Sequence, residues 1–154
     1  SDGHVAFTEA GYNYRLTDIQ AALVRGQFGR FEEILSKKQE LVDVYLTELK
    51  HHAVTLPICP QGKKHSWQSF HVLLDDSIER DLLINKLKIA GSGTNLGAQC
   101  MPYQYYYAKK YKLDVPCLFP NGLRAYRQGL VLPLYEKLTE PDILQVVKAL
   151  EQEI

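Results

Sequence analysis

The sequence predicts an α/β fold in which a small sheet packs with helices and a long helix lies near the N-terminus. One observation is an approximate 3.6-residue apolar period from about Asp18 to Lys50, which returns in residues 79–90 and after Thr139. Another is that short apolar runs of strand character, at 67–74, 93–96 and 130–132, lie between these helical patterns. Because strands and helices alternate along the chain, we expect an α/β layer rather than a helix bundle.

Composition places the chain among ordinary globular proteins. Its 154 residues are enough for one domain with a real core, and they are 45% hydrophobic and 23% charged. Eighteen basic residues balance eighteen acidic ones, so nothing suggests a nucleic-acid or anionic-membrane partner. No apolar run approaches the roughly 20 residues of a membrane span. We therefore expect no nucleic acid and no membrane among its partners.

The cysteines and the first residues of the chain indicate the cellular compartment in which we expect the protein. Cys59, Cys100 and Cys117 are odd in number and form no C-x-x-C pair, which argues against a disulfide framework and against a zinc site. We predict no metal site and a reducing, cytoplasmic location. No signal-peptide pattern opens the chain, and it begins at Ser1 without an initiator methionine, which suits a fragment.

The first helical pattern contains two glycines that predict a break. Gly26 and Gly29 each cost roughly 1 kcal/mol relative to alanine inside a helix. We expect a first piece that is mostly apolar and buried, and a second piece that is half-exposed.

Alternation then predicts a strand from Trp67 to Leu74. Phe70 would lie on one face of this strand and His71 on the other, together with Trp67. Residues 51–66 read as a loop that includes a short strand near 54–56. The remaining expected elements are a helix over 79–90 that Gly91 ends, a strand over 93–96, an aromatic helical segment over 103–112, a helix over 123–128, a strand over 130–132 and a helix that begins at Thr139 with Ile143, Val146, Val147 and Leu150 facing inward.

The stretch 11–23 combines a turn with a helix start. Thr17 stands at an N-cap position, and Gln20 three residues later completes a capping box. A helix start favours anions, and the guanidinium of Arg15 offers a planar fork that fits phosphate or carboxylate. The spacing alone leaves two readings open, a phosphate-binding turn and a plain helix cap with one surface arginine.

This stretch, GYNYRLTDIQAAL, resembles the signature that follows the cofactor lysine in the DegT/DnrJ/EryC1/StrS family of sugar aminotransferases. The resemblance continues at 67–74, at 91–95, and through LPLY and LTE at 132–140. It covers almost the whole chain but only the C-terminal part of the family's protein. The resemblance implies the aspartate-aminotransferase fold of enzymes that use pyridoxal 5'-phosphate (PLP). Residues 1–16 would be the lead-in with the cofactor-phosphate signature, and 17–154 the C-terminal small domain, without the large PLP domain.

The resemblance also implies roles for particular residues. Asn13 and Arg15 match the asparagine and arginine that reach across the dimer to the PLP site of the neighbouring subunit. His71 lies in a strand whose family histidine faces the substrate, although a lone strand histidine can equally be structural. We assign no catalytic residue to this chain, because the Schiff-base lysine would lie upstream of Ser1. The chain's own paired lysines, such as Lys37 and Lys38, look like solvated surface groups.

One segment departs from the family pattern. Residues 97–102 read GAQCMP where many relatives have a His-Tyr-x-Pro-x-His pattern, so the substrate stays open. The tyrosines that follow, at 103–111, could stack on a nucleotide base or pack against neighbouring elements.

The resulting expectation is part of a cytoplasmic, homodimeric PLP enzyme of polysaccharide biosynthesis with shared active sites. It would transfer an amino group from an amino acid, glutamate in the first instance, to a keto-sugar nucleotide. Two alternatives stay open: a sugar dehydratase of the same family, and a non-catalytic dimerisation or regulatory domain. The fragment alone is expected to be inactive and not to bind PLP by itself.

Overall fold

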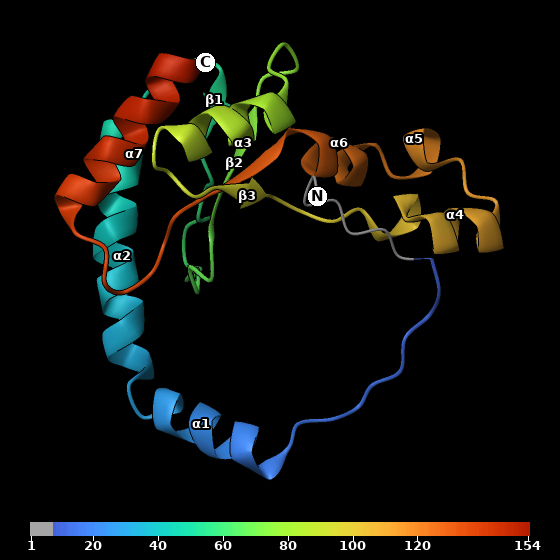
Figure 1. Ribbon diagram of the computed structural model, residues 1–154, viewed down its shortest axis with the longest axis horizontal. Helices are drawn as coiled ribbons and strands as arrows, with labels where there is room; N and C mark the ends of the chain where they lie inside the picture. Colours follow the sequence, from blue (N-terminus) through green and yellow to red (C-terminus); the bar gives the residue numbers. More distant parts are fainter. Residues whose placement is uncertain (1–7) are drawn as a thin grey trace.

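The computed structural model describes residues 8–154, so the first seven residues of the predicted lead-in lie outside the described part. Residues 8–17 contain no helix or strand. The elements that follow are shown in Figure 1. In chain order they are α1 (Asp18–Phe28), α2 (Phe31–Glu48), β1 (Val54–Thr55), β2 (Phe70–Leu74), α3 (Arg80–Ile89), β3 (Asn95–Leu96), a 3-10 helix (Met101–Tyr103), α4 (Tyr105–Tyr111), α5 (Val115–Leu118), α6 (Pro120–Gln128), β4 (Gly129–Leu132) and α7 (Glu140–Glu153).

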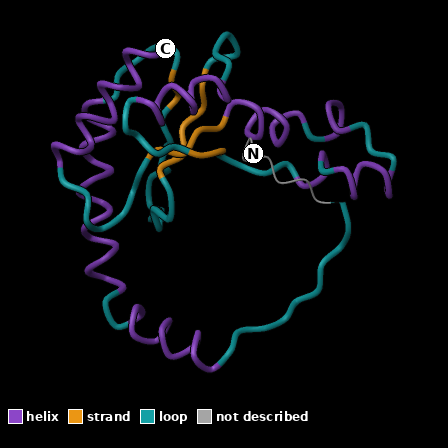
Figure 2. Tube along the Cα trace, in the orientation of Figure 1, coloured by secondary structure: helices purple, strands orange, loops and turns teal. Residues whose placement is uncertain are grey.

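The four strands form one antiparallel sheet in the order β1-β2-β4-β3, drawn in orange in Figure 2. Both β2 and β3 pair with β4, so they run parallel to each other with β4 between them. The connection β2–α3–β3 is therefore a split crossover, which agrees with the strand–helix–strand order read from the sequence. The mixed α/β class is confirmed, and its antiparallel strand pairs give it the α+β form.

The core lies on one face of the sheet. Phe70, Val72 and Leu74 are buried, and the register places Leu132 and Leu130 of β4 opposite the first two. Helices α2, α3 and α7 supply the rest of this core, and Figure 1 shows them on the same side of the sheet. The predicted inner face of α7 is confirmed, since Ile143, Val146, Val147 and Leu150 are all buried.

The opposite face of the sheet is less covered. His71 and Leu73 of β2 and Val131 of β4 are only half-buried there. Residues opposite one another in antiparallel strands point to the same face, so the pairs His71–Val131 and Leu73–Gly129 define this face. We call it the open face.

Local signals explain where α7 begins. The Thr139 backbone N–H donates to the Asp142 carboxylate at 2.8 Å, and the Thr139 side chain completes the capping box. Pro141 stands in the first turn, where its missing N–H costs nothing.

The predicted break within the first helical pattern is confirmed, but the expected burial of its first piece is wrong. Helix α1 ends at Phe28 and contains no buried residue. Ile19 is 78% exposed and Phe28 is 73% exposed. Figure 1 shows α1 lying apart from the sheet and its helices. Its apolar side chains have no packed element to bury them among the described residues, and apolar composition alone cannot say what covers a helix.

Trp67 also differs from expectation. The strand begins at Phe70, and Trp67 precedes it with φ 43° and lies in the core rather than on the face of His71. Its indole N–H donates to Oε1 of Gln39 at 2.6 Å, which satisfies the polar edge of a buried ring.

A second, smaller cluster holds the segment between β3 and β4. Cys100, Val115 and Leu123 form its buried centre. The guanidinium of Arg80 on α3 donates to the carbonyl of Tyr126, which ties α6 to the main body. Within the described residues, no helix is both long enough and apolar enough to cross a membrane.

Candidate functional site

The Asn13–Arg15 segment forms a defined turn before α1. Oδ1 of Asn13 accepts the backbone N–H of Arg15 at 2.9 Å, an Asx-type bond two residues along the chain. Arg15 has φ 67°, in the left-handed region that non-glycine residues rarely adopt. The side-chain carbonyl of Asn13 therefore stabilises a backbone conformation that is unfavourable for an arginine on its own.

The start of α1 is closed by its own side chains. The capping box predicted at Thr17 and Gln20 is confirmed: the Thr17 N–H donates to Oε1 of Gln20 at 3.0 Å, and the Gln20 N–H donates to Oγ1 of Thr17 at 3.3 Å. Asp18 adds a negative charge in the first turn. This helix end is consequently a poorer anion site than the sequence suggested, and any anion would depend on the preceding turn.

That preceding turn carries donors that suit a phosphate. In the described part of the chain, the Arg15 guanidinium is exposed and has no hydrogen-bond or ion-pair partner. Asn13 is exposed as well, and in the described residues only its side-chain carbonyl oxygen is engaged by the turn. Guanidinium and amide donors are the groups that bind phosphate oxygens, so this set fits the phosphate of PLP.

His71 lies on the open face, at the middle of the sheet. Its ring covers the backbone where β4 and the end of β3 meet, next to the bond from the Gly97 N–H to the Gly129 carbonyl at 3.0 Å. A Cβ at either glycine would overlap Nε2 of the ring. Nε2 is buried and has no hydrogen-bond partner in the described residues.

Burial decides the charge of this imidazole. Desolvation disfavours the protonated ring, and it lowers the pKa of His71 below the usual value. The ring is therefore neutral at neutral pH and offers one N–H donor.

The predicted site residues do not meet within one chain. Asn13 and Arg15 precede α1, whereas His71 lies on β2, and Figure 1 shows the lead-in far from the sheet. Within residues 8–154, no hydrogen bond or ion pair joins the turn to His71. If both serve an active site, the rest of that site comes from elsewhere.

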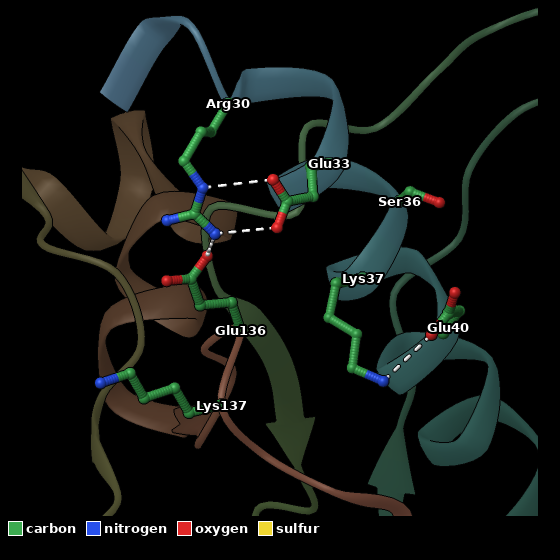
Figure 3. A pocket seen from close by; sticks show the side chains of 7 residues that line it. All are labelled: Arg30, Glu33, Ser36, Lys37, Glu40, Glu136 and Lys137. Atoms are coloured by element: carbon green, nitrogen blue, oxygen red, sulfur yellow. Dashed lines mark hydrogen bonds and ion pairs between the residues drawn. The ribbon is translucent and has the colours of Figure 1, made fainter. Parts of the chain in front are cut away.

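A surface hollow of about 650 Å³ lies between α2 and the loop before α7, and it contains none of these residues. Figure 3 shows its polar lining. Arg30 pairs with Glu33 at 2.9 Å and with Glu136 at 3.3 Å, and Lys37 pairs with Glu40 at 3.0 Å. Because all of the charged lining groups except Lys137 pair with each other at an exposed surface, we assign the hollow a structural role: Arg30 links the start of α2 to the loop before α7.

The tyrosine segment packs largely on itself. Tyr107 stacks on Tyr111 with centroids 6.2 Å apart, and Tyr103 contacts Tyr126 at 5.5 Å. Lys109 and Lys110 lie over tyrosine rings of the same helix, α4, so they are solvated surface lysines. The described residues contain no cluster of three or more metal-ligating side chains, and all three cysteines are free.

Sequence reasoning missed the two glycines that contact His71. It singled out Gly97 only as a departure from a family pattern, and it gave Gly129 no role. A glycine inside a strand commonly marks a close approach of another group, but the strand was predicted over 130–132, so Gly129 lay outside it and this signal did not apply.

A relative of known sequence is similar to this chain over nearly its whole length. An uncharacterised protein of Methanocaldococcus jannaschii, MJ1066, is 28% identical over 151 residues, which are 94% of this chain and 38% of that protein. This chain thus spans well under half of that relative.

Solved structures share the fold. Helicobacter pylori PseC, an aminotransferase involved in the biosynthesis of pseudoaminic acid, matches 95% of this chain and 39% of its own with a TM-score of 0.79 at 17% identity. S. venezuelae DesV matches 94% of this chain and 38% of its own with a TM-score of 0.78 at 24% identity. The PLP form of Spr1654 from Streptococcus pneumoniae matches 90% of this chain and 37% of its own with a TM-score of 0.78 at 21% identity. At these identities the likeness shows the fold alone.

The sequence profile of one family matches almost the entire chain, at residues 2–151. That match includes the Asn13–Arg15 turn, the strand that holds His71 and most of the last helix. The chain therefore belongs to the DegT/DnrJ/EryC1/StrS aminotransferase family.

Proposed function

We propose that this chain is the C-terminal part of a PLP-dependent nucleotide-sugar aminotransferase, called the parent enzyme below. The proposed reaction transfers an amino group from an amino acid, with glutamate as the expected donor, to a keto-sugar on a nucleotide. Its setting is the cytoplasm, a reducing compartment in which the three free cysteines stay thiols.

The observation that best supports the proposal is the Asn13–Arg15 turn, because it occurs in a chain that belongs to an aminotransferase family. The turn exposes an amide and a guanidinium and holds Arg15 in a backbone conformation that it would not adopt unaided. A turn whose two side-chain donors have no partner among residues 8–154 is suited to bind a phosphate, whereas α1 is stabilised by its own capping box.

In the proposed site, the chain's residues bind and orient. Arg15 and Asn13 bind the phosphate of PLP held by the neighbouring subunit, and His71 contacts the sugar-nucleotide substrate. When bound, PLP supplies the electron withdrawal and the amino-group carrier that no side chain of this chain provides. The lead-in before α1, which contains the turn, lies apart from the sheet that contains His71 (Figure 1), and this separation supports active sites shared between two subunits of a homodimer.

The test is amino transfer by the parent enzyme. Purified parent enzyme is incubated with PLP, glutamate and a keto-sugar nucleotide, and 2-oxoglutarate and the amino sugar are both quantified. Equal amounts of the two products support the proposal. Loss of a sugar hydroxyl without amino-group transfer would identify the dehydratase alternative, and PLP-free dimers without either product would identify a non-catalytic domain.

A further inference from the structure

We propose that Gly97 and Gly129 are positioning residues that hold the His71 imidazole as an Nδ1–H donor directed at an oxygen acceptor of the substrate. The inference rests on the proposed function for the identity of the substrate, a sugar nucleotide. The placement of the ring rests on the structure of this chain alone.

The first step is geometric. His71, Gly97 and Gly129 share the open face, and the two glycines leave the backbone uncovered beside the ring. A Cβ at Gly97 would overlap Nε2 and Cδ2 of His71 and would lie 2.7 Å from the carbonyl carbon of Gly129. Only glycine at both positions allows the imidazole to lie across the sheet. We call the pair the glycine cradle.

The second step concerns the two ring nitrogens. Nε2 is enclosed by the cradle and has no hydrogen-bond partner in the described residues. A buried N–H without an acceptor costs more than a buried lone pair against C–H groups. The neutral ring therefore carries its proton on Nδ1, the nitrogen that is not enclosed. The lowered pKa of His71 agrees with a neutral ring.

The third step links the donor to a ligand. The open face is the side of the sheet without the helical layer of the main core, and His71 is only half-buried there. An Nδ1–H on this side donates to hydroxyl, carbonyl or phosphate oxygens, all of which a sugar nucleotide contains. An aromatic ring over strand glycines could also serve packing alone, so the test must separate the donor from the ring.

The ring arm of the test uses the 154-residue chain labelled with ¹⁵N-histidine at pH 8. Long-range ¹H–¹⁵N correlation should show a pyrrole-type Nδ1 and a pyridine-type Nε2 for His71. Gly97→Ala should move both signals, whereas Gly93→Ala, whose Cβ meets nothing within 4 Å, should leave them in place. A proton on Nε2, or equal populations of the two tautomers, would overturn the proposal. This measurement on the unmodified chain needs no variant to fold.

The substrate arm uses the parent enzyme with PLP. His71→Phe keeps a ring over the cradle but has no donor, so KM for the sugar nucleotide should rise roughly threefold to tenfold with little change in kcat. His71→Asn restores a donor near the Nδ1 position and should recover part of that loss, whereas His71→Gln, which reaches the Nε2 position, should not. An unchanged KM in a folded His71→Phe enzyme would show that the ring only packs and would overturn the proposal.

The two arms separate the possible failures. If the wild-type parent enzyme transfers no amino group, the proposed function fails, and the ring arm still decides whether the cradle fixes the tautomer. If amino transfer occurs but the ring arm fails, the proposed function stands and the cradle does not.

Discussion

Arg15 has two properties that a substitution changes together, a guanidinium and a left-handed backbone at φ 67°. We expect Arg15→Ala in the parent enzyme to weaken PLP retention roughly tenfold to hundredfold, because a charge-assisted contact to phosphate is lost. Arg15→Asn removes the same charge, but asparagine tolerates φ above zero. Both variants should therefore weaken PLP by similar factors in equilibrium dialysis.

Arg25→Ala, an exposed arginine of α1, is the matched control and should retain PLP normally. An Arg15→Asn enzyme with wild-type affinity would show that turn strain, not the guanidinium, explains any Ala effect.

His71 gives a pH dependence whose sign follows from its lowered pKa. The unfolded state binds a proton near pH 6.5, and the folded state binds it only at lower pH. The contribution of the neutral His71 ring to the free energy of unfolding is thus fully present above about pH 6.5, and it is lost as the pH falls below this value. We expect the urea concentration at the unfolding midpoint of wild type to decrease when the pH is lowered from 7.5 to 5.5. The decrease should be smaller in His71→Phe.

Thr47→Ala, an exposed change in α2 that removes no titratable group, supplies the control and should keep the wild-type pH dependence. Equal slopes for wild type and His71→Phe would mean that the buried ring does not titrate as described.

For single residues, the sequence was informative about side chains whose functional groups could bind a ligand directly. Asn13, Arg15 and His71 could be proposed from a motif, although nothing in the structure of one chain tests their roles. The cradle could not be predicted, because it depends on how Gly129 of β4 and Gly97, just after β3, come to lie against a ring from β2. The register that brings Gly129 beside His71 is set by the whole sheet.

Among the elements, α7 is specified most completely by local signals. Its capping box lies at an exposed helix start, so the effect of Thr139→Ala should reflect the cap rather than the core. We expect this change to lower the free energy of unfolding by about 1 kcal/mol in urea titrations. Thr47→Ala, at an exposed position inside α2, is the control and should cost nothing or stabilise slightly. Equal effects of the two variants would contradict a stabilising cap.

Elements were predicted well where period and boundary signals agreed, as in α7 and in β2 around Phe70. Helix α1 shows the limit: its cap and its end at Phe28 were predictable, but its burial was not, since burial depends on what else packs there. The short α5, Val115–Leu118, was missed because a four-residue helix that includes Pro116 has no measurable period. Trp67 was assigned to the strand because the alternating pattern extends to it, whereas the strand begins at Phe70 and Trp67 packs in the core.

At the scale of the whole molecule, the described residues form a helix-covered sheet with an exposed lead-in and an exposed α1 (Figures 1 and 2). Several large apolar side chains of α1 are exposed, among them Ile19, Leu23 and Phe28. A surface of this kind is typical of a segment that contacts another domain or subunit. This arrangement fits the proposal that the turn acts on a site built mainly by other parts of a homodimer.

The chain by itself should therefore be inactive. We expect the purified 154-residue chain to form no 2-oxoglutarate from glutamate and a keto-sugar nucleotide in the presence of PLP. The parent enzyme, assayed in parallel, is the positive control. Turnover by the chain, in a preparation free of the parent enzyme, would place the catalytic lysine within these residues.

In the proposed enzyme, the Asn13–Arg15 turn completes the active site of a neighbouring subunit. Mixing a parent Arg15→Ala chain with a parent chain that lacks the upstream cofactor lysine tests it directly. If the active sites are shared between subunits, one site of each mixed dimer contains both changes and the other site contains neither. Activity should then recover towards half the wild-type value per mixed dimer. Verified subunit exchange without any recovery would show that Arg15 acts within its own chain, and would contradict the account.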